Sequence, residues 1–261
     1  MKGKKGAVAA LAFFCCAAWA QAGEITSDNL AKELEKLFRS RPDIVIDVLR
    51  RESESVLDIA QQGSNLKRRH SLEVQWRADM KSEKKVRLEG RPLHGEKDAR
   101  VRIVAFSDFT CHFCRQAAVM VNEILREYGR DVSLTFKNFP LEGKGSAMQA
   151  AIAFLAIAQQ DNDKAWKFYN ALFADRDKLA GEGDKFIAET AAAVGADVKK
   201  LQKDMKSKKF SDMVAEDIAD GQKLGVEGTP FFLVNNLVVR GALPLDLFRL
   251  AVEMALGEKG K

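Results

Sequence analysis

The sequence is poor in the residues that build disulfide frameworks and metal sites, with four cysteines and three histidines among 261 residues. Cys15 and Cys16 lie in an apolar N-terminal segment that we expect to be removed. The mature chain then keeps only Cys111 and Cys114, which form a single CxxC. Two cysteines this close together cannot make a framework of structural disulfides, so the pair is judged as a site in its own right.

The N-terminal segment has the order of a secretory signal. Lysines at positions 2, 4 and 5 precede an apolar run at residues 7–20, and alanines at positions 18, 20 and 22 surround a cleavage site. The run is too short to span a bilayer comfortably, which disfavours a membrane anchor. A lipid anchor on Cys15 or Cys16 is the alternative, which the bulky Phe13 and Phe14 disfavour. We predict a cleaved signal peptide at residues 1–22 and a periplasmic or secreted protein.

The sequence also lacks a basic stripe of the kind that binds nucleic acid. Its 42 lysines and arginines alternate with 37 acidic residues along most of the chain, as on a solvated surface. Hydrophobic residues make up 46% of the sequence, which permits one ordinary core plus a smaller appended region. We therefore expect a globular protein with no nucleic-acid partner.

Residues 23–90 carry dense charges of both signs and too few apolar residues to close a core alone, which indicates a helical arm. Pro42 suits the first turn of a helix. The apolar positions at helical spacing are Leu30, Leu34, Leu37, Phe38, Ile44, Val45, Val48, Leu49, Val56 and Ile59. An isolated amphipathic helix needs a surface that buries its stripe. The arm therefore either packs on the rest of the chain or forms a homo-oligomer through residues 25–89.

Pro92 and Gly95 break the helical pattern and mark the start of a main domain at residues 91–261. Strands are expected at 101–106 and 132–136 around a helix at 111–128, then helices over about 145–225, strands at 231–234 and 237–240, and a helix at 244–256. The first strand, helix and strand form a parallel βαβ unit. This order predicts an α/β protein: a thioredoxin fold with an inserted all-helical subdomain and an N-terminal helical arm.

Cys111 and Cys114 lie where the first strand hands over to a helix. Residues three apart share one face of a helix, so the two thiols can close a disulfide. With Thr110 as N-cap, Cys111 is the first helical residue, where free N–H groups and the helix dipole favour a thiolate. We predict that Cys111 is the attacking or attacked sulfur and that the more buried Cys114 resolves the mixed disulfide.

Four further residues are predicted to serve the cysteine pair. His112 would tune it by stabilising the Cys111 thiolate, unless it is only an exposed loop side chain. Phe113 offers apolar surface to unfolded substrates. Pro230 opens a strand without an N–H for the ladder, and Thr229 before it can pair with an extended substrate chain.

The same cysteines permit other functions. A zinc site would have to combine Cys111 and Cys114 with His70, His94 or His112, without a second CxxC or a paired His motif. Thiolates also suit Cu(I), although no further Met or Cys ligands lie near the motif. A redox chaperone that uses these cysteines is another alternative. The prediction is that the protein uses no metal and no other cofactor.

Three separate segments together resemble one family. FSDFTCHFC at 106–114, NFPL at 138–141, and GVEGTPFFLVNN at 225–236 followed by RGALPLDLF at 240–248 are similar to the DsbA-like thioredoxin family of secreted disulfide oxidoreductases. The resemblance covers about residues 97–256. It implies dithiol–disulfide exchange with cysteine-containing unfolded or misfolded proteins, a cis-proline loop facing the CxxC, and a membrane redox partner that resets the pair.

The chain departs from the family at two places. Ala105 stands in the first strand where many relatives carry an acid, and Asp108 lies only in the following loop. The dipeptide between the cysteines is His-Phe, so the redox potential of relatives cannot be carried over. The arm more loosely resembles the oligomerisation stalk of some relatives, and oligomerised relatives tend to act as isomerases. Oxidase and isomerase therefore both stay open.

Overall fold

The computed structural model describes residues 27–257 and divides the chain into two compact units, residues 1–66 and 67–261. The predicted signal peptide at residues 1–22 lies outside the described residues. Among the described helices there is none with the length and apolar character that a membrane span requires. We call residues 67–257 the main unit and describe each unit by itself.

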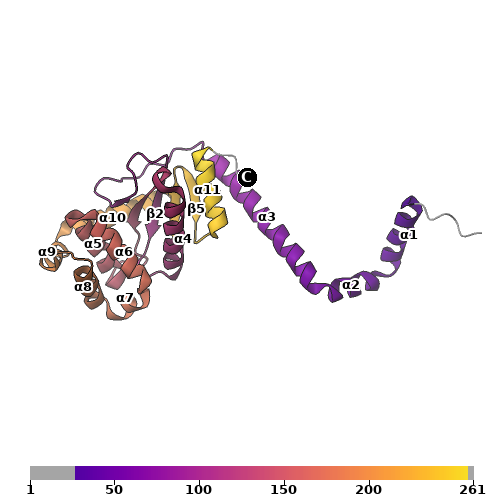
Figure 1. Ribbon diagram of the computed structural model, residues 1–261, viewed down its shortest axis with the longest axis horizontal. Helices are drawn as coiled ribbons and strands as arrows, with labels where there is room; N and C mark the ends of the chain where they lie inside the picture. The colour runs from indigo at the N-terminus through magenta and orange to yellow at the C-terminus, as the bar shows by residue number, and fades with distance from the viewer. Residues whose placement is uncertain (1–26, 258–261) are drawn as a thin grey trace, which may run out of the picture. The chain divides into compact units, whose positions relative to one another are not determined.

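The first unit is helical, as predicted. It contains α1 (Ser27–Ser40), α2 (Pro42–Arg51) and the beginning of α3 (Ser53–Asp79), and Pro42 opens α2 (Figure 1). None of residues 29–66 is buried. Its exposed large apolar side chains are Leu30, Leu34, Leu37, Phe38, Ile46, Val48, Leu49, Leu57, Ile59 and Leu66. The helices are thus present, whereas self-association through residues 25–89 stays a prediction.

The main unit is built around a five-stranded sheet in the order β1-β3-β2-β4-β5. The strands are β1 (Leu93–His94), β2 (Val101–Ser107), β3 (Val132–Asn138), β4 (Phe231–Val234) and β5 (Leu237–Arg240). β2 and β3 are parallel and joined by α4 (His112–Tyr128), and the other pairs are antiparallel. Asn235 makes the turn between β4 and β5 with a φ of 51°. The thioredoxin fold is confirmed, and only the two-residue β1 was not predicted.

Alternation along β2 supplies both faces of the sheet. Ile103 and Ala105 belong to a large core together with residues of α4 and of α11 (Leu245–Leu256). Val104 and Phe106 point to a second cluster, which residues of α10 (Lys208–Lys223) help to cover. Because both faces are covered, β2 reads as a nearly continuous apolar run.

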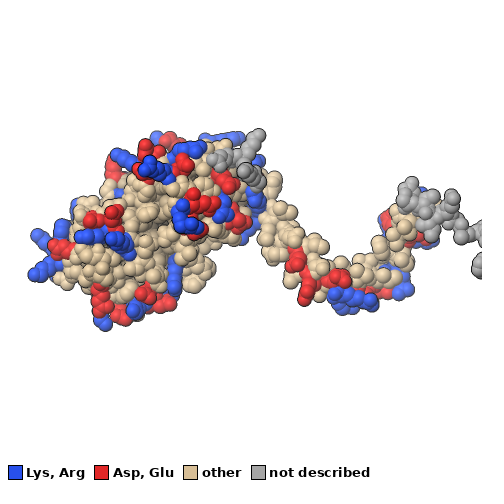
Figure 2. Space-filling view, viewed as in Figure 1, with Lys and Arg blue, Asp and Glu red and all other residues tan. Residues whose placement is uncertain are grey.

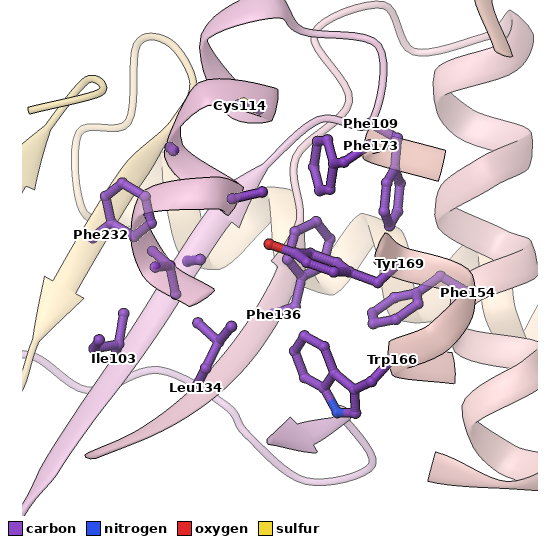
Figure 3. Packing of buried hydrophobic residues seen from close by; sticks show 14 of the residues in the cluster. Ile103, Phe109, Cys114, Leu134, Phe136, Phe154, Trp166, Tyr169, Phe173 and Phe232 are labelled. Carbon is purple, nitrogen blue, oxygen red and sulfur yellow. The ribbon is translucent and has the colours of Figure 1, made fainter. Parts of the chain in front are cut away.

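The predicted helical insertion contains α5 (Gly145–Gln160), α6 (Asn162–Ala174), α7 (Arg176–Glu182), α8 (Asp184–Ala193), α9 (Val198–Asp204) and α10. Its aromatic residues pack directly against residues of the sheet (Figure 3). Ring centroids lie 5.0 Å apart for Phe109 and Phe173 and 5.2 Å apart for Phe136 and Tyr169. Such pairs contribute about 0.5–1.5 kcal/mol each beyond their buried area. The insertion therefore shares one core with the sheet.

The end of α3 belongs to the main unit, although it lies within the predicted arm at residues 23–90. The division falls after Leu66, because Trp76 in α3 is fully buried in the main core. Trp76 Nε1 donates to the carbonyl of Val238 at 2.9 Å, and a carboxylate oxygen of Asp79 accepts the N–H of Val238 at 3.0 Å. The end of α3 thus satisfies the outer backbone groups of β5, an edge strand.

Buried charges join the segment that follows α3 to α10 and β3. The Asp217 carboxylate in α10 accepts hydrogen bonds from Arg91 Nε at 2.9 Å and from the N–H of Asn138 at 2.9 Å. Lys137 Nζ lies 3.2 Å from the same carboxylate and donates to the carbonyl of Arg87 at 2.8 Å. Buried charges are tolerated only when they are paired in this way. The network holds α10 against β3.

Candidate active site around Cys111 and Cys114

α4 begins one residue later than predicted, so Cys111 is its N-cap rather than its first helical residue. The helix begins at His112, and Cys111 has φ −77° and ψ 128°, values of extended chain. Thr110 is not the N-cap, because its hydroxyl donates to the side chain of Asp108 at 2.7 Å. Cys111 still lies next to the free N–H groups of the first turn, which favour a negative charge.

The Cys111 thiol is held in its charged form more easily than an ordinary thiol. Its pKa is lowered from 9.0 to about 5, chiefly by a hydrogen bond from the Cys114 thiol. Hydrogen bonds from Thr229 and from the backbone of Cys114 and Phe113 lower the pKa further, whereas burial opposes them. Cys111 is half-buried, so its sulfur remains accessible to a second molecule.

Cys114 has the opposite character. It is 1% exposed, and burial together with the hydrogen bond to Cys111 raises the pKa of its thiol. Its Sγ accepts a weak hydrogen bond from the N–H of Asp108 at 3.5 Å. The site therefore pairs an accessible thiolate at Cys111 with a buried thiol at Cys114.

The loop before β4 lies against Cys111 although it is far away in the sequence. Cys111 Sγ is 3.5 Å from the carbonyl oxygen of Thr229, and the Thr229–Pro230 peptide bond is cis. The geometry thus brings two of the predicted substrate-binding residues, Thr229 and Pro230, next to the CxxC.

Close packing of α10 brings this loop to the active site. A Cβ on Gly221 would lie 2.6 Å from the ring of Phe139, a distance that real Cβ atoms do not adopt. Gly221 therefore lets α10 lie directly on the residues that follow β3. The carbonyl of Gly221 also accepts the N–H of Val226 at 2.9 Å, which turns the chain toward Thr229.

His112 and Phe113 lie between the two cysteines on the first turn of α4. The Nε2 atom of His112 is 3.0 Å from the side-chain nitrogen of Gln116, and its ring meets Phe113 edge-on at 5.6 Å. The groups that lower the pKa of Cys111 are those named above, so tuning by His112 stays a prediction. Phe113 is 58% exposed and offers the apolar surface expected beside the accessible sulfur.

Two polar residues contact the active-site loop without having been predicted as site residues. Asp108 accepts hydrogen bonds from Thr110 and Leu141, and Arg176 Nη1 donates to the carbonyl of Thr110 at 2.7 Å. An Asp two residues before a Thr is a recognisable turn pattern that could have indicated Asp108. Arg176 lies 66 residues from Thr110 in the chain, and no local pattern indicated the contact.

Nothing in residues 27–257 groups three or more His, Cys, Asp or Glu side chains as a metal site would. His94 packs edge-on against Trp166 at 5.2 Å, and His112 lies against Gln116. Within this part of the chain, Cys111 and Cys114 therefore lack the further ligands that a zinc site needs.

Comparison with known proteins gives concordant results. The family described as Thioredoxin matches residues 87–254. A probable disulfide bond formation protein D of Bacillus cereus is 36% identical over 151 residues, which are 54% of this chain and 68% of that protein. The crystal structure of a thioredoxin-like oxidoreductase from Silicibacter pomeroyi is 30% identical, with a TM-score of 0.59 over 66% of this chain and 95% of that one. A periplasmic thioredoxin-like protein from Salmonella enterica has the same fold at 23% identity, with a TM-score of 0.57 over 65% and 91% of the two chains.

Proposed function

The chain belongs to the Thioredoxin family and is a thiol-disulfide oxidoreductase, and from this premise we propose that it introduces disulfide bonds into cysteine-containing unfolded or misfolded proteins of the periplasm or the secreted fraction. Cys111 is the sulfur that exchanges with substrate, and Cys114 is the sulfur that leaves when the mixed disulfide forms and that resolves it in the reverse direction. The observation that carries this proposal is the contrast between the accessible Cys111, with its pKa of about 5, and the buried Cys114.

The exchange proceeds in two balanced steps. A substrate thiolate attacks Cys111 Sγ of the oxidised pair, which forms a mixed disulfide and breaks the Cys111–Cys114 bond. Cys114 leaves as a thiolate and takes up a proton. A second substrate thiolate then attacks the substrate sulfur of the mixed disulfide and releases Cys111 as a thiolate. The substrate loses two electrons and gains a disulfide, and the CxxC is reduced to a dithiol.

The low pKa of Cys111 favours this direction. Stabilising the Cys111 thiolate makes it a better leaving group in the second step. It also stabilises the reduced form of the pair, which makes the disulfide a stronger oxidant. Burial disfavours the thiolate form of Cys114 and keeps its sulfur from substrates, so protein substrates exchange at Cys111. These two effects together support an oxidase.

Three residues around Cys111 support binding of an extended chain. The backbone of Thr229 lies beside Cys111 Sγ, so a substrate strand paired with it would carry its cysteine to that sulfur. Pro230 directly precedes β4, and the exposed Phe113, two residues after Cys111, offers apolar contact. Backbone pairing and apolar contact are tolerant of sequence, which suits many different substrates.

A second candidate function, isomerisation, is favoured by the N-terminal arm. We take residues 1–22 as the signal peptide, 23–90 as the arm, of which residues 67–90 belong to the main unit, and 91–261 as the catalytic domain with its insertion at about 145–225. The exposed apolar side chains of α1 and α2 are of the kind that helices bury by association. A homo-oligomer through residues 25–89 would bring several CxxC sites together, and these can hold one misfolded chain while its disulfides are rearranged.

Each oxidation leaves the Cys111–Cys114 pair reduced, so turnover needs an electron acceptor. We propose a membrane redox partner, since a signal peptide would export the chain away from cytosolic oxidants and reductants. The periplasmic location named for the Salmonella protein supports export. On the face drawn in Figure 2, blue and red side chains are interspersed.

The direction is tested by trapping thiols in the native periplasm and measuring the fraction of the Cys111–Cys114 pair that is oxidised. We expect a predominantly oxidised pair, and the purified oxidised protein should form disulfides in a reduced unfolded substrate. Cys111→Ser should abolish this activity. A wholly reduced pair in the periplasm would contradict the oxidase proposal and favour the isomerase. Retention of function in the double Cys→Ser protein would instead indicate a chaperone, and a tight Cu(I) site without exchange activity would indicate metal binding.

A further inference from the structure

Asp108 directs its backbone groups and one carboxylate oxygen at residues 110–114 and the other carboxylate oxygen at the loop that follows β3. Its N–H donates to Cys114 Sγ at 3.5 Å, and its carbonyl accepts the N–H of Cys111 at 3.2 Å. One carboxylate oxygen accepts both the N–H and the hydroxyl of Thr110 at 2.7 Å. The other accepts the N–H of Leu141 at 2.9 Å. Asp108 is 3% exposed, so its carboxylate is taken from water for the sake of these contacts.

Arg176 contacts the same loop from the helical insertion. It lies at the start of α7 in the insertion, and its Nη1 donates to the carbonyl of Thr110 at 2.7 Å. Its Nη2 pairs with the exposed Asp177. Together with the bonds to Asp108, this leaves the N–H, the hydroxyl and the carbonyl of Thr110 all engaged.

We propose that Asp108 and Arg176 are positioning residues that clamp Thr110 and thereby fix Cys111 at the start of α4. The inference rests on the proposed role of Cys111 as the sulfur that exchanges with substrate. Cys111 is the N-cap of α4, and its N–H donates to the carbonyl of Asp108, so its position depends on the residues before it. Helix ends fray when their first residues are not held. Releasing Thr110 would turn Cys111 Sγ away from the first-turn N–H groups and from Thr229.

This role differs from that of a proton relay beneath the cysteines. Position 105 in β2 is alanine, so the strand supplies no acid there. Both carboxylate oxygens of Asp108 already accept hydrogen bonds from Thr110 and Leu141, and Asp108 meets Cys114 with its N–H. Asp108 therefore acts through geometry, and Arg176 makes the position of Cys111 depend on the helical insertion.

The test is the pH profile of the alkylation rate of Cys111 in the reduced mature protein. Asp108→Ala should slow alkylation at pH 5 about fivefold, because a rise of about one unit in the pKa of Cys111 lowers its thiolate fraction from about one half to about one eleventh. Arg176→Ala should slow alkylation at pH 5 about threefold, the effect of a rise of about 0.7 units in the pKa of Cys111. Asp108→Asn keeps an oxygen for Thr110, so its rate should stay within about twofold of the wild type. Asp177→Ala is the matched control and should leave the profile unchanged.

Folded Asp108→Ala and Arg176→Ala proteins with wild-type profiles would overturn the clamp. An Asp108→Asn protein as slow as Asp108→Ala would also overturn it, because the bond to Leu141 would then be the one that matters. Should Asp108→Ala not fold, Thr110→Val removes only the hydroxyl bond and carries the test together with Arg176→Ala. Alkylation needs no substrate protein, so failure of the clamp is distinguishable from failure of the proposed oxidase function.

Discussion

Removal of the Cys114 thiol should raise the pKa of Cys111. Among the groups that lower this pKa from 9.0 to about 5, the hydrogen bond from Cys114 is the largest. The Cys114→Ala substitution deletes that donor and leaves only Thr229 and two backbone groups. Because Cys114 is buried, water cannot readily replace the lost donor.

The size of the effect follows from the fraction of Cys111 that is ionised. At pH 6 a thiol with a pKa of about 5 is ~90% thiolate. If the Cys114 donor accounts for half of the four-unit shift, the pKa of Cys111 rises to about 7 and the thiolate fraction at pH 6 falls to ~10%. Since the thiolate is the nucleophile, alkylation of Cys111 at pH 6 should slow about ninefold.

The assay is the rate of alkylation of Cys111 from pH 4 to pH 9, checked against the ultraviolet absorbance of the thiolate. Cys114→Ser is the matched control, because its hydroxyl still donates a hydrogen bond and should preserve part of the low pKa. Overlapping profiles for Cys114→Ala and the reduced wild type would refute the assignment of the Cys114 thiol as the main donor. A wild-type midpoint near 9 would refute the stabilised thiolate itself.

Three further predictions concern stability. The pKa of Cys111 is lower in the folded protein than its ordinary value. The reduced wild type should therefore gain stability over Cys111→Ala as pH rises from about 5 toward 9.0, and lose that gain as pH falls through about 5. Urea unfolding at pH 4 and pH 8 measures the stability difference, and a difference independent of pH would contradict the prediction. Trp76→Ala should lower the free energy of unfolding of the main unit by about 3–5 kcal/mol, because a fully buried indole and its hydrogen bond to Val238 are lost, whereas the 68% exposed Leu57 should tolerate alanine in the same urea titration. Gly221→Ala should lower the free energy of unfolding by about 1–3 kcal/mol, because the added Cβ would overlap the Phe139 ring. Gly181→Ala is the control, since a Cβ there meets nothing within 4 Å. Equal thermal midpoints for the two variants would contradict the prediction and show that α10 can shift.

Local patterns predicted most of the secondary structure. The strands at 231–234 and 237–240 match β4 and β5 residue for residue, because short apolar runs around Asn235 leave little freedom in where the turn lies. The insertion at about 145–225 was predicted from its continuous helical periodicity. The CxxC was recognisable because its two cysteines are neighbours in the sequence and need only one turn of helix to meet.

Predictions that depended on contacts across the chain succeeded less often. The sequence of α3 resembles the rest of the charged arm, and only its packing in the core shows that Trp76 belongs to the main unit. Thr110 was predicted as the N-cap, but in the structure its hydroxyl donates to the carboxylate of Asp108. A single tryptophan or threonine carries no signal of which distant group it will meet.

By itself the sequence determined the order of elements, the family and the two cysteines that exchange electrons, since each is indicated by a pattern of residues close together in the chain. The sequence also predicted that Cys111 carries the charge, from its place at the start of a helix, and the tertiary structure decided how strongly that charge is stabilised. That outcome depends on the burial of Cys114 and on donors from Thr229, a residue more than a hundred positions away. It also decided that Asp108 and Arg176 meet at Thr110. Burial and hydrogen-bond geometry arise only when distant segments pack, and together they make one half of a symmetric CxxC motif a thiolate.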